Sequence, residues 1–261
     1  MVSEKTAAKE RFRPVQSILI SQPDPQSNRS PFYELAKKWN IKLDWRPFIE
    51  VVPIPKQEFR KSKVNLEEYT AIVFTSKNAV DFYFNKCEEL KINMPTSTKY
   101  FCSTVTIANY LQKYIVYRKR KIFFGEKQLD DILPLFEKFK ENEKFLLPTS
   151  NLGSKNIVDF LNKNEIVFDE LMMFMTVSSN ITDLENIYYD MLVFFNPLGI
   201  ASLYENFPNF KQNNTRIAVF GEATKKEAEA HDLVIDIMAP SPETPSIVTA
   251  IDNYMEITNK K

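Results

Sequence analysis

Three segments of this sequence recur in the same order about 120 positions later in the chain. The first is SILISQP, a helix-length stretch and RPFIEVV, matched by KFLLPTS, a similar stretch and MMFMTVS. The second is YTAIVFTSKNAV, matched by YDMLVFFNPLGI, and the third is KYFCSTVTIANYL, matched by RIAVFGEATKKEA. Because chance does not keep the order of all three, we interpret the halves as copies of one ancestral unit. The chain is therefore expected to fold into two similar domains.

Within each half, short apolar runs alternate with amphipathic stretches, which is typical of strands and helices that alternate around a parallel sheet. The 261 residues are enough for two domains of ordinary size. Predicted strands cover residues 17–21, 41–52, 71–74, 99–102, 122–124, 145–147, 166–177, 191–195, 217–220 and 234–238. Predicted helices include residues 31–39, 77–89, 106–113, 129–139 and 155–163. The expected fold class is α/β, with two flavodoxin-like parallel-sheet domains.

Two predicted strands, residues 41–52 and 166–177, exceed the usual length of ~5–6 residues and occupy matching places in the repeat. Strands of that length can leave one domain and enter the other. We therefore predict a two-stranded β connector, a discontinuous domain 1, a domain 2 and a cleft between the domains. The predicted boundaries are residues 1–45 and 178–261 for domain 1, 53–170 for domain 2, and 46–52 and 171–177 for the connector. The alternative is two sequential domains, one for each half.

Composition excludes several classes of function. Thirty-four basic and thirty-four acidic residues give a formal net charge of zero, so no global field attracts nucleic acid or an anionic membrane. The four glycines do not form a dinucleotide-binding or nucleotide-binding loop. A single histidine argues against a multi-histidine metal site and against most serine or cysteine nucleophiles that a histidine activates. An anionic ligand would therefore have to be held by local geometry.

The cysteines and the hydropathy pattern indicate a cytoplasmic protein. Cys87 and Cys102 lie in apolar patterns without metal-ligand spacing, which fits free thiols in a reducing compartment. No apolar run approaches the ~20 residues that a membrane-spanning helix needs. The first 14 residues lack the apolar segment of a signal peptide. We expect no membrane partner.

Four ordered segments between about residues 17 and 254 resemble the uroporphyrinogen-III synthase family. The family pairs I-F-T-S-x-x-A-V with a later F-F-S-P-S-G, and this chain has IVFTSKNAV at residues 72–80 and FFNPLG at residues 194–199. The family's G-x-x-T turn matches residues 221–224, and also residues 103–106 with a serine in place of the glycine. Its A-x-S-P-T-x-x-x-L segment matches residues 239–247. The order and spacing of the motifs carry the resemblance, since no single motif is very specific.

The resemblance implies the discontinuous domain layout and also an activity. Family members convert hydroxymethylbilane, an acidic linear tetrapyrrole, into uroporphyrinogen III in haem biosynthesis. The substrate loses water and closes into a ring while its last pyrrole, ring D, is inverted. The resemblance implies no cofactor and a monomeric lyase. Its implied partners are the small tetrapyrrole substrate and, transiently, the upstream enzyme that forms the bilane.

The chain departs from the family pattern at four positions. Phe174 stands where many members have tyrosine, so a phenolic proton donor is missing there. Asn196 and Leu198 replace two serines, and Ser103 replaces a glycine. These departures leave open a second hypothesis, a protein of the same fold that binds a tetrapyrrole or another anion with impaired catalysis. A third hypothesis is a two-domain small-molecule sensor, which would resemble periplasmic binding proteins.

Polar turns that follow predicted strands form the candidate substrate-binding site. In an open parallel sheet, ligands bind at the carboxyl ends of the strands, where helix N-termini present N–H groups with partial positive charge. Such groups and short hydroxyls can hold several carboxylates without many lysines, which fits a net charge of zero. The candidate binding residues are Ser76, Ser103, Thr104, Thr149, Ser150, Asn196, Gly199, Gly221, Glu222, Ala223 and Arg118.

The catalytic candidates are the hydroxyls of Thr75, Thr106 and Thr224, because position 174 lacks a tyrosine. They would act as weak general acids near the leaving hydroxyl, with substrate carboxylates or water as the proton source. Each has a structural alternative, since the first can cap a helix and the others can pack in a first helical turn. Arg118 belongs to a basic run at residues 118–121, and such runs usually form a solvated edge. No metal site is expected, and His231 has no assigned role.

Overall fold

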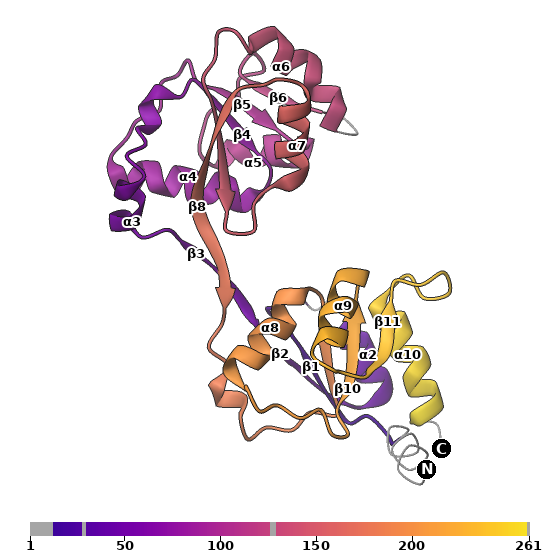
Figure 1. The fold of residues 1–261 in the computed structure, drawn as a ribbon. Helices are drawn as coiled ribbons and strands as arrows, with labels where there is room; N and C mark the ends of the chain where they lie inside the picture. Colours follow the sequence, from indigo (N-terminus) through magenta and orange to yellow (C-terminus); the bar gives the residue numbers. More distant parts are fainter. Residues whose placement is uncertain (1–12, 28–29, 126–128, 260–261) are drawn as a thin grey trace. The chain divides into compact units, whose positions relative to one another are not determined.

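The computed structural model describes residues 13–27, 30–125 and 129–259 and has an α/β fold with parallel sheets, as predicted. The chain divides into two compact units. Unit 1 joins the described residues up to Glu50 with those from Val177 onward, and unit 2 runs from Val51 to Thr176. Each unit holds one sheet with helices on both faces (Figure 1). Among the described helices, none has the length and apolar character needed to cross a membrane.

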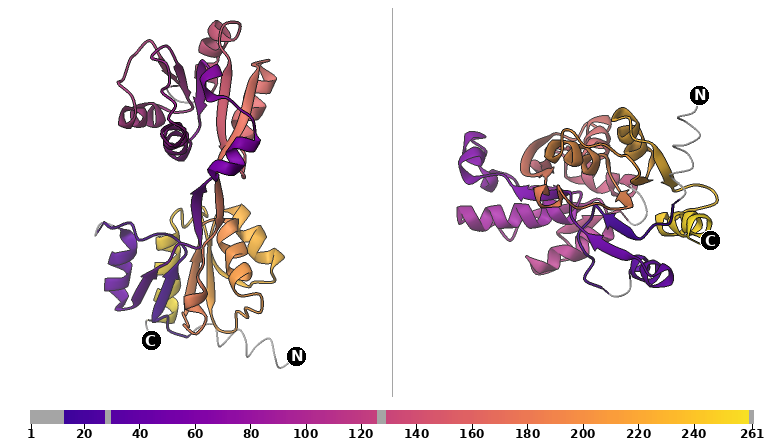
Figure 2. Two further views of the ribbon diagram at one scale, coloured as in Figure 1. Left: turned by 90° about the vertical axis from the view of Figure 1, so that its left-hand side faces the viewer. Right: turned by 90° about the horizontal axis from the view of Figure 1, so that it is seen from below.

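Unit 1 contains a five-stranded sheet in the order β11-β10-β9-β1-β2, and its neighbouring strands are parallel. In the left view of Figure 2, α2 (purple) and α10 (yellow) cover one face of this sheet, and α8 and α9 (orange) cover the other. The elements are β1 (Ser17–Ile20), α2 (Pro31–Trp39), β2 (Lys42–Trp45), a 3-10 turn (Thr182–Leu184), β9 (Met191–Phe194), α8 (Pro197–Asn206), β10 (Arg216–Phe220), α9 (Glu222–Ala230), β11 (Ile235–Ala239) and α10 (Ile247–Thr258).

Unit 2 contains a six-stranded sheet in the order β3-β8-β7-β4-β5-β6, which is parallel from β8 to β6. The boundary between the units falls inside β3 and inside β8. The elements are β3 (Ile49–Pro53), α3 (Lys56–Lys61), β4 (Ala71–Phe74), α4 (Lys77–Leu90), β5 (Lys99–Cys102), α5 (Val105–Tyr110), β6 (Ile122–Phe124), α6 (Leu133–Phe139), β7 (Phe145–Ser150), α7 (Lys155–Lys163) and β8 (Phe168–Ser178), with 3-10 turns at Leu66–Glu68, Leu111–Lys113 and Leu129–Ile132.

The repeated segments occupy equivalent places in the two sheets. β1 lies between β2 and β9, and its repeat, β7, lies between β8 and β4. Beyond β9 come β10 and then β11, just as β5 and then β6 follow beyond β4. Five strands of each sheet therefore correspond in order, although the chain enters the sheets at different strands, and unit 2 has β3 as an additional edge strand.

The central strands are buried on both faces, which explains their continuous apolar sequences. All four residues of β4 and all four of β9 are buried. Alternate side chains of a strand point to opposite faces, so Ile72 and Phe74 join one core cluster while Ala71 and Val73 join another. Full burial of a Leu or Phe side chain stabilises the fold by about 1.5–3 kcal/mol. Each sheet is thus held by two cores, and its polar turns are left at the strand ends.

The prediction of one long strand at residues 41–52 is wrong, because the structure divides this segment into β2 and β3. Pro47 lies in the break and has no backbone N–H to donate to a strand ladder. Phe48 turns into the core of unit 1, where its ring packs edge-on against Phe194 with centroids 5.7 Å apart. The matching segment contains no proline and forms one continuous strand, β8, of 11 residues.

Candidate functional site

Four hydroxyl-bearing residues gather where β4, β5 and β7 end in unit 2. We call Thr75, Ser103, Thr149 and Ser154 the hydroxyl cluster. The Ser154 Oγ lies 3.4 Å from both threonine Oγ1 atoms, and the Ser103 Oγ donates to the Thr75 carbonyl at 3.5 Å. These distances exceed the ~2.7–2.8 Å that is typical of O–H···O bonds. The hydroxyls are therefore only weakly bonded to one another and can bond a ligand.

An open pocket of about 450 Å³ adjoins the hydroxyl cluster. Thr75, Ser103, Ser154, Lys155, Asn156 and Ile157 line it. The exposed Lys155 begins α7, so an ammonium group and the N–H groups of a helix start lie at the same place. Ammonium, amide and hydroxyl groups together suit carboxylate ligands. Sequence reasoning missed Ser154, Lys155 and Asn156, because they follow β7 only after a further turn.

Helix capping accounts for part of the predicted binding set in unit 2. The Ser76 Oγ accepts the backbone N–H three residues later at 3.0 Å, and the Thr104 Oγ1 does the same at 3.4 Å. The Ser150 Oγ accepts the N–H two residues later at 3.3 Å and so shapes the turn before α7. Thr106, a predicted catalytic residue, is exposed in the first turn of α5. Ser76 and Thr104 are therefore the capping residues of α4 and α5, and the capping role that was the alternative for Thr75 belongs to Ser76.

The corresponding edge of unit 1 begins with the turn from β9 into α8. The Asn196 Oδ1 caps this helix by accepting the Gly199 N–H at 2.9 Å. A Cβ atom on Gly199 would lie 3.4 Å from the Phe194 ring and 3.6 Å from the Ser21 Oγ, so this helix start is closely packed. Ser21 directly follows β1 and is 4% exposed, and its Oγ has no hydrogen-bond partner within the part of the chain that the structure describes. Sequence reasoning missed Ser21, although its place after a strand is the same signal that found Thr75.

The turn from β10 into α9 forms the second part of this edge. Gly221 has a φ of +88°, a backbone conformation that residues with a side chain rarely adopt. Its N–H donates to the Ala239 carbonyl at 2.7 Å. Glu222 and Ala223 are exposed in the first turn of α9. Thr224 is 2% exposed, and its hydroxyl donates to the Phe220 carbonyl at 2.8 Å. The structure therefore favours a positioning role for Thr224 over the predicted role as a general acid.

Arg118 does not lie with the other predicted binding residues of unit 2. It precedes β6, and it lines a separate cavity together with residues that precede β5, such as Thr98. Because β4, β5 and β6 are parallel, these amino ends lie at the edge opposite to Thr75 and Ser103. The structure thus separates Arg118 from the hydroxyl cluster.

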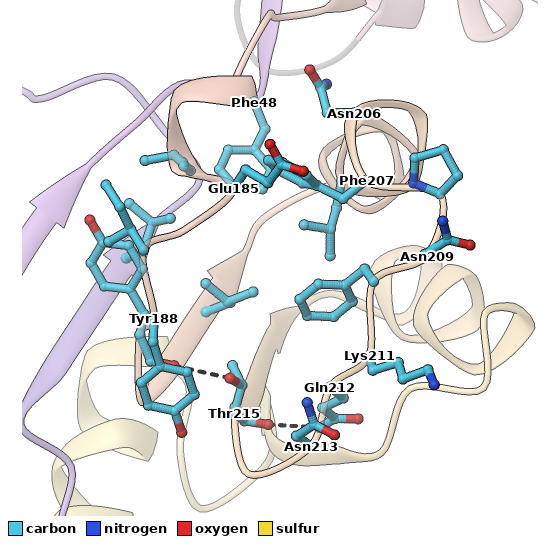
Figure 3. A pocket seen from close by; sticks show the side chains of 18 residues that line it. Phe48, Glu185, Tyr188, Asn206, Phe207, Asn209, Lys211, Gln212, Asn213 and Thr215 are labelled. Atoms are coloured by element: carbon cyan, nitrogen blue, oxygen red, sulfur yellow. Dashed lines mark hydrogen bonds between the residues drawn. The ribbon is translucent and has the colours of Figure 1, made fainter.

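Unit 1 has a mainly apolar cavity of about 350 Å³ at the amino ends of β9 and β10 (Figure 3). Two hydrogen bonds join polar groups of its lining. The Thr215 hydroxyl donates to the Tyr189 carbonyl at 3.0 Å, and the Gln212 side chain donates to the Thr215 carbonyl at 3.0 Å. Glu185 and Lys211 contribute one charge of each sign to its lining. This cavity has no evident preference for an anion.

Neither of the two cysteines of unit 2 is an activated nucleophile. Burial raises the pKa of the Cys102 thiol to about 12, and burial also raises the pKa of Cys87 to about 11, so both stay protonated at neutral pH.

Phe174 is 7% exposed and stacks on Phe82 with ring centroids 5.0 Å apart. Its ring is therefore a core group in this structure. Within the described residues, no three His, Cys, Asp or Glu side chains form a group that could hold a metal ion.

The chain is similar to known proteins over most of its length. The family model described as uroporphyrinogen-III synthase HemD matches residues 35–249. The porphyrin biosynthesis protein HemD of Ruminiclostridium josui is 32% identical over 164 residues, which are 61% of this chain and 32% of that protein. The match thus spans about a third of the length of that curated relative.

Two solved structures share the fold. Uroporphyrinogen-III synthetase from Helicobacter pylori 26695 has a TM-score of 0.56 at 15% identity, with 93% of this chain and 99% of that chain covered. A mutant uroporphyrinogen III synthase from the extremely thermophilic bacterium Thermus thermophilus has a TM-score of 0.50 at 11% identity, with 94% of this chain and 100% of that chain covered. At these identities the likeness concerns the fold alone.

Proposed function

Because the chain belongs to the uroporphyrinogen-III synthase family, we propose that it converts linear hydroxymethylbilane into uroporphyrinogen III. The resemblance noted in the sequence is confirmed by the family match over residues 35–249. In the proposed reaction the substrate loses its terminal hydroxyl as water and closes into a macrocycle with ring D inverted. The protein is then a lyase of tetrapyrrole biosynthesis that needs no cofactor for this step.

The observation that carries the proposal is the hydroxyl cluster with its adjoining pocket at the carboxyl edge of unit 2. The proposed substrate bears carboxylates on flexible arms. The Lys155 ammonium, the first N–H groups of α7 and the hydroxyls of Thr75 and Ser103 offer donors of the kind that bind such arms. In unit 1, the first N–H groups of α9, after the turn at Gly221, offer further backbone donors.

We propose that one substrate molecule engages the carboxyl edges of both units. This proposal includes two flavodoxin-like domains that β3 and β8 join as a two-stranded connector. Unit 1 has the strand order 2-1-3-4-5, and the strands β8-β7-β4-β5-β6 of unit 2 are its counterpart. Binding a flexible linear molecule in a ring-like shape brings its reacting ends together. Such a proximity effect contributes up to about 7–11 kcal/mol in well-oriented cases.

The proposed chemistry asks little of the protein beyond orientation and weak acid catalysis. Departure of the hydroxyl as water needs one proton and leaves a cationic azafulvene, to which the terminal pyrrole then bonds. Inversion of ring D also requires its bond to the neighbouring bridging carbon to break and to form again at the other α carbon, and one proton is released when the pyrrole becomes aromatic again. The Thr75 and Ser103 hydroxyls are the candidates for holding the departing oxygen, since they line the pocket and are weakly bonded internally. A substrate carboxylic acid or water supplies the proton. We also propose a cytoplasmic monomer that accepts its substrate from the enzyme that forms the bilane.

A direct experiment tests the proposed activity. Freshly prepared hydroxymethylbilane is incubated with the purified protein, and the products are oxidised and separated into isomers I and III. We expect isomer III to dominate and its rate of formation to scale with protein concentration. Isomer I alone, formed at the rate seen without protein, would contradict the proposal.

A second candidate function is tetrapyrrole or anion binding with impaired turnover. The burial of Phe174 against Phe82 favours it, since no phenolic donor stands at that position. Titration of the protein with uroporphyrinogen III, made anaerobically, separates the two functions. Binding without isomer III formation would support the binding protein, whereas binding with turnover supports the synthase.

A further inference from the structure

A second cavity of unit 2, which we call the amino-edge cavity, lies where β5 and β6 begin. Its volume is about 460 Å³, within the range of roughly 300–1,000 Å³ that is common for small-molecule sites. It shares no lining residue with the pocket beside the hydroxyl cluster. Residues of α4, of the segment before β5 and of the segment before β6 line it.

The walls of the amino-edge cavity are mainly apolar and aromatic. Phe84 stacks on Tyr114 with ring centroids 4.8 Å apart and lies 6.0 Å from the Tyr100 ring. Met94 and Ile122 add aliphatic surface to the same lining. An apolar ligand body that enters here would remove both its own surface and these side chains from water, which favours binding by about 25 cal/mol per Å².

Positive charge predominates in the lining of the cavity. Arg118 and Lys121 contribute two cations, and the exposed Glu88 is the one acidic side chain among the described lining residues. The Lys121 ammonium donates to the Thr96 carbonyl, which holds it beside the cavity. The Arg118 guanidinium is exposed and has no hydrogen bond or ion pair with the rest of the described chain. A free guanidinium next to an apolar wall suits a carboxylate, which it can bind through two parallel hydrogen bonds.

We propose that the amino-edge cavity binds a small carboxylate with an apolar body. The carboxylate pairs with Arg118, while the body packs against Phe84, Tyr114 and Ile122. The cavity of unit 1 in Figure 3 is similarly apolar but has balanced charges, so it lacks this anion preference. The proposal gives a function to Arg118 and Lys121 of the basic run at residues 118–121, which the hydroxyl cluster does not use. It does not depend on the proposed synthase activity, because no residue of the carboxyl edge takes part.

Isothermal titration of the full chain tests the proposal with two carboxylates, 2-naphthoate and octanoate, and with their neutral analogues 2-naphthamide and octanol. We expect at least one carboxylate to bind, and its neutral analogue to bind at least 10-fold more weakly. The comparison of the two carboxylates distinguishes an aryl body from an alkyl body. Absence of binding by both carboxylates at millimolar concentration, or equal affinity for acid and neutral analogue, would overturn the proposal.

Matched variants locate the binding. Arg118→Ala should weaken carboxylate binding at least 10-fold, whereas Arg60→Ala, which removes an exposed arginine of α3 outside this cavity, should not change it. Glu88→Gln removes the opposing charge and should tighten binding several-fold. Met94→Glu should abolish binding, with thermal unfolding used to verify its fold. Equal affinities of the Arg118→Ala and Arg60→Ala proteins would place the ligand elsewhere.

Thiol labelling gives an independent readout. Cys87 lines the amino-edge cavity, whereas Cys102 does not. Saturating carboxylate should slow maleimide labelling of Cys87 several-fold without changing that of Cys102, as followed by peptide mass spectrometry. An unchanged rate at Cys87 under conditions of measured binding would overturn the assigned site. Production of isomer III without carboxylate binding would refute this inference and leave the proposed function intact.

Discussion

The carboxyl edges of the two sheets share one strand order but present different polar groups. Unit 2 presents side-chain oxygens of Thr75 and Ser103 and the ammonium of Lys155. Unit 1 presents backbone turns at Asn196 and Gly221, and its Thr224 hydroxyl is turned inward to a carbonyl. The duplicated topology thus determines which edge of each sheet can bind a ligand. The local residues determine which hydrogen-bond donors that edge presents. Truncation of a side chain should therefore lower kcat/KM more in unit 2, and a change of backbone conformation should lower it more in unit 1.

The largest expected effect comes from Thr75→Val, which removes the hydroxyl and keeps a similar side-chain volume. We expect kcat/KM for isomer III to fall by about 10- to 100-fold, the size of one lost hydrogen bond to a charged group. The measurement is the initial rate of isomer III formation. Thr249→Val, at an exposed position of α10, is the control and should keep the wild-type rate. Equal rates for both variants would show that the Thr75 hydroxyl does not act on the substrate.

A smaller loss is expected from Gly221→Ala in unit 1. Among the described residues, no atom beyond the two adjoining residues lies within 4 Å of the added Cβ. The effect therefore comes from the φ of +88°, which costs about 1–3 kcal/mol for a residue with a side chain. We expect relaxation of the turn and about a 10-fold lower kcat/KM. Thr224→Val, its matched control, should reduce the free energy of unfolding by about 1 kcal/mol with kcat unchanged. A loss of kcat in Thr224→Val beyond that of Gly221→Ala would restore the catalytic role predicted from the sequence.

Lys155→Gln should have a still smaller effect, because an exposed ammonium is screened by solvent. We expect a rise in KM of about 3- to 10-fold with kcat retained, and a weaker dependence of KM on salt concentration. Lys163→Gln removes the same charge from the last turn of the same helix and should leave KM unchanged. An identical salt dependence in the two variants would mean that Lys155 does not contact the anionic substrate.

The smallest effect concerns alkaline stability, since both cysteines lie in unit 2. Burial raises the pKa of Cys87 to about 11 and of Cys102 to about 12, so the folded thiols stay protonated while unfolded thiols ionise near pH 8.5. Their contribution to stability is complete below about pH 8 and is lost as the pH rises towards 11–12. We expect the midpoint of thermal unfolding to fall less between pH 8 and 10.5 in the Cys87→Ala, Cys102→Ala double variant than in the wild type. Equal falls would contradict the assigned burial of the thiols.

Much of the fold could be predicted because buried parallel strands leave a plain signal in the sequence. The bounds of β4, β5 and β6 and of α2 and α7 agree with those predicted from apolar runs and amphipathic stretches. The break at Pro47 could not be read as easily, because apolar residues on both sides continue the strand pattern. The missing N–H of Pro47 is visible in the sequence, but the inward turn of Phe48 is a tertiary effect that a residue pattern does not contain.

The site could be predicted only in part, because position after a strand does not tell where a side chain points. This rule found Thr75, Ser103 and Thr149, which do meet at one edge. It also selected Thr224, whose hydroxyl instead bonds a carbonyl four residues back along the chain. It missed Lys155, because in the sequence a lysine beside a binding pocket looks the same as any other surface lysine at a helix start.

We propose that one acidic tetrapyrrole engages the carboxyl edges of both units, and one measurement tests this proposal. The most direct measurement is an NMR titration of isotope-labelled protein with anaerobic uroporphyrinogen III, following the amide signals of Ser103, Lys155, Gly199 and Gly221. We expect signals from both units to shift and to saturate at the same ligand concentration. Shifts confined to one unit, or different midpoints for the two units, would contradict it.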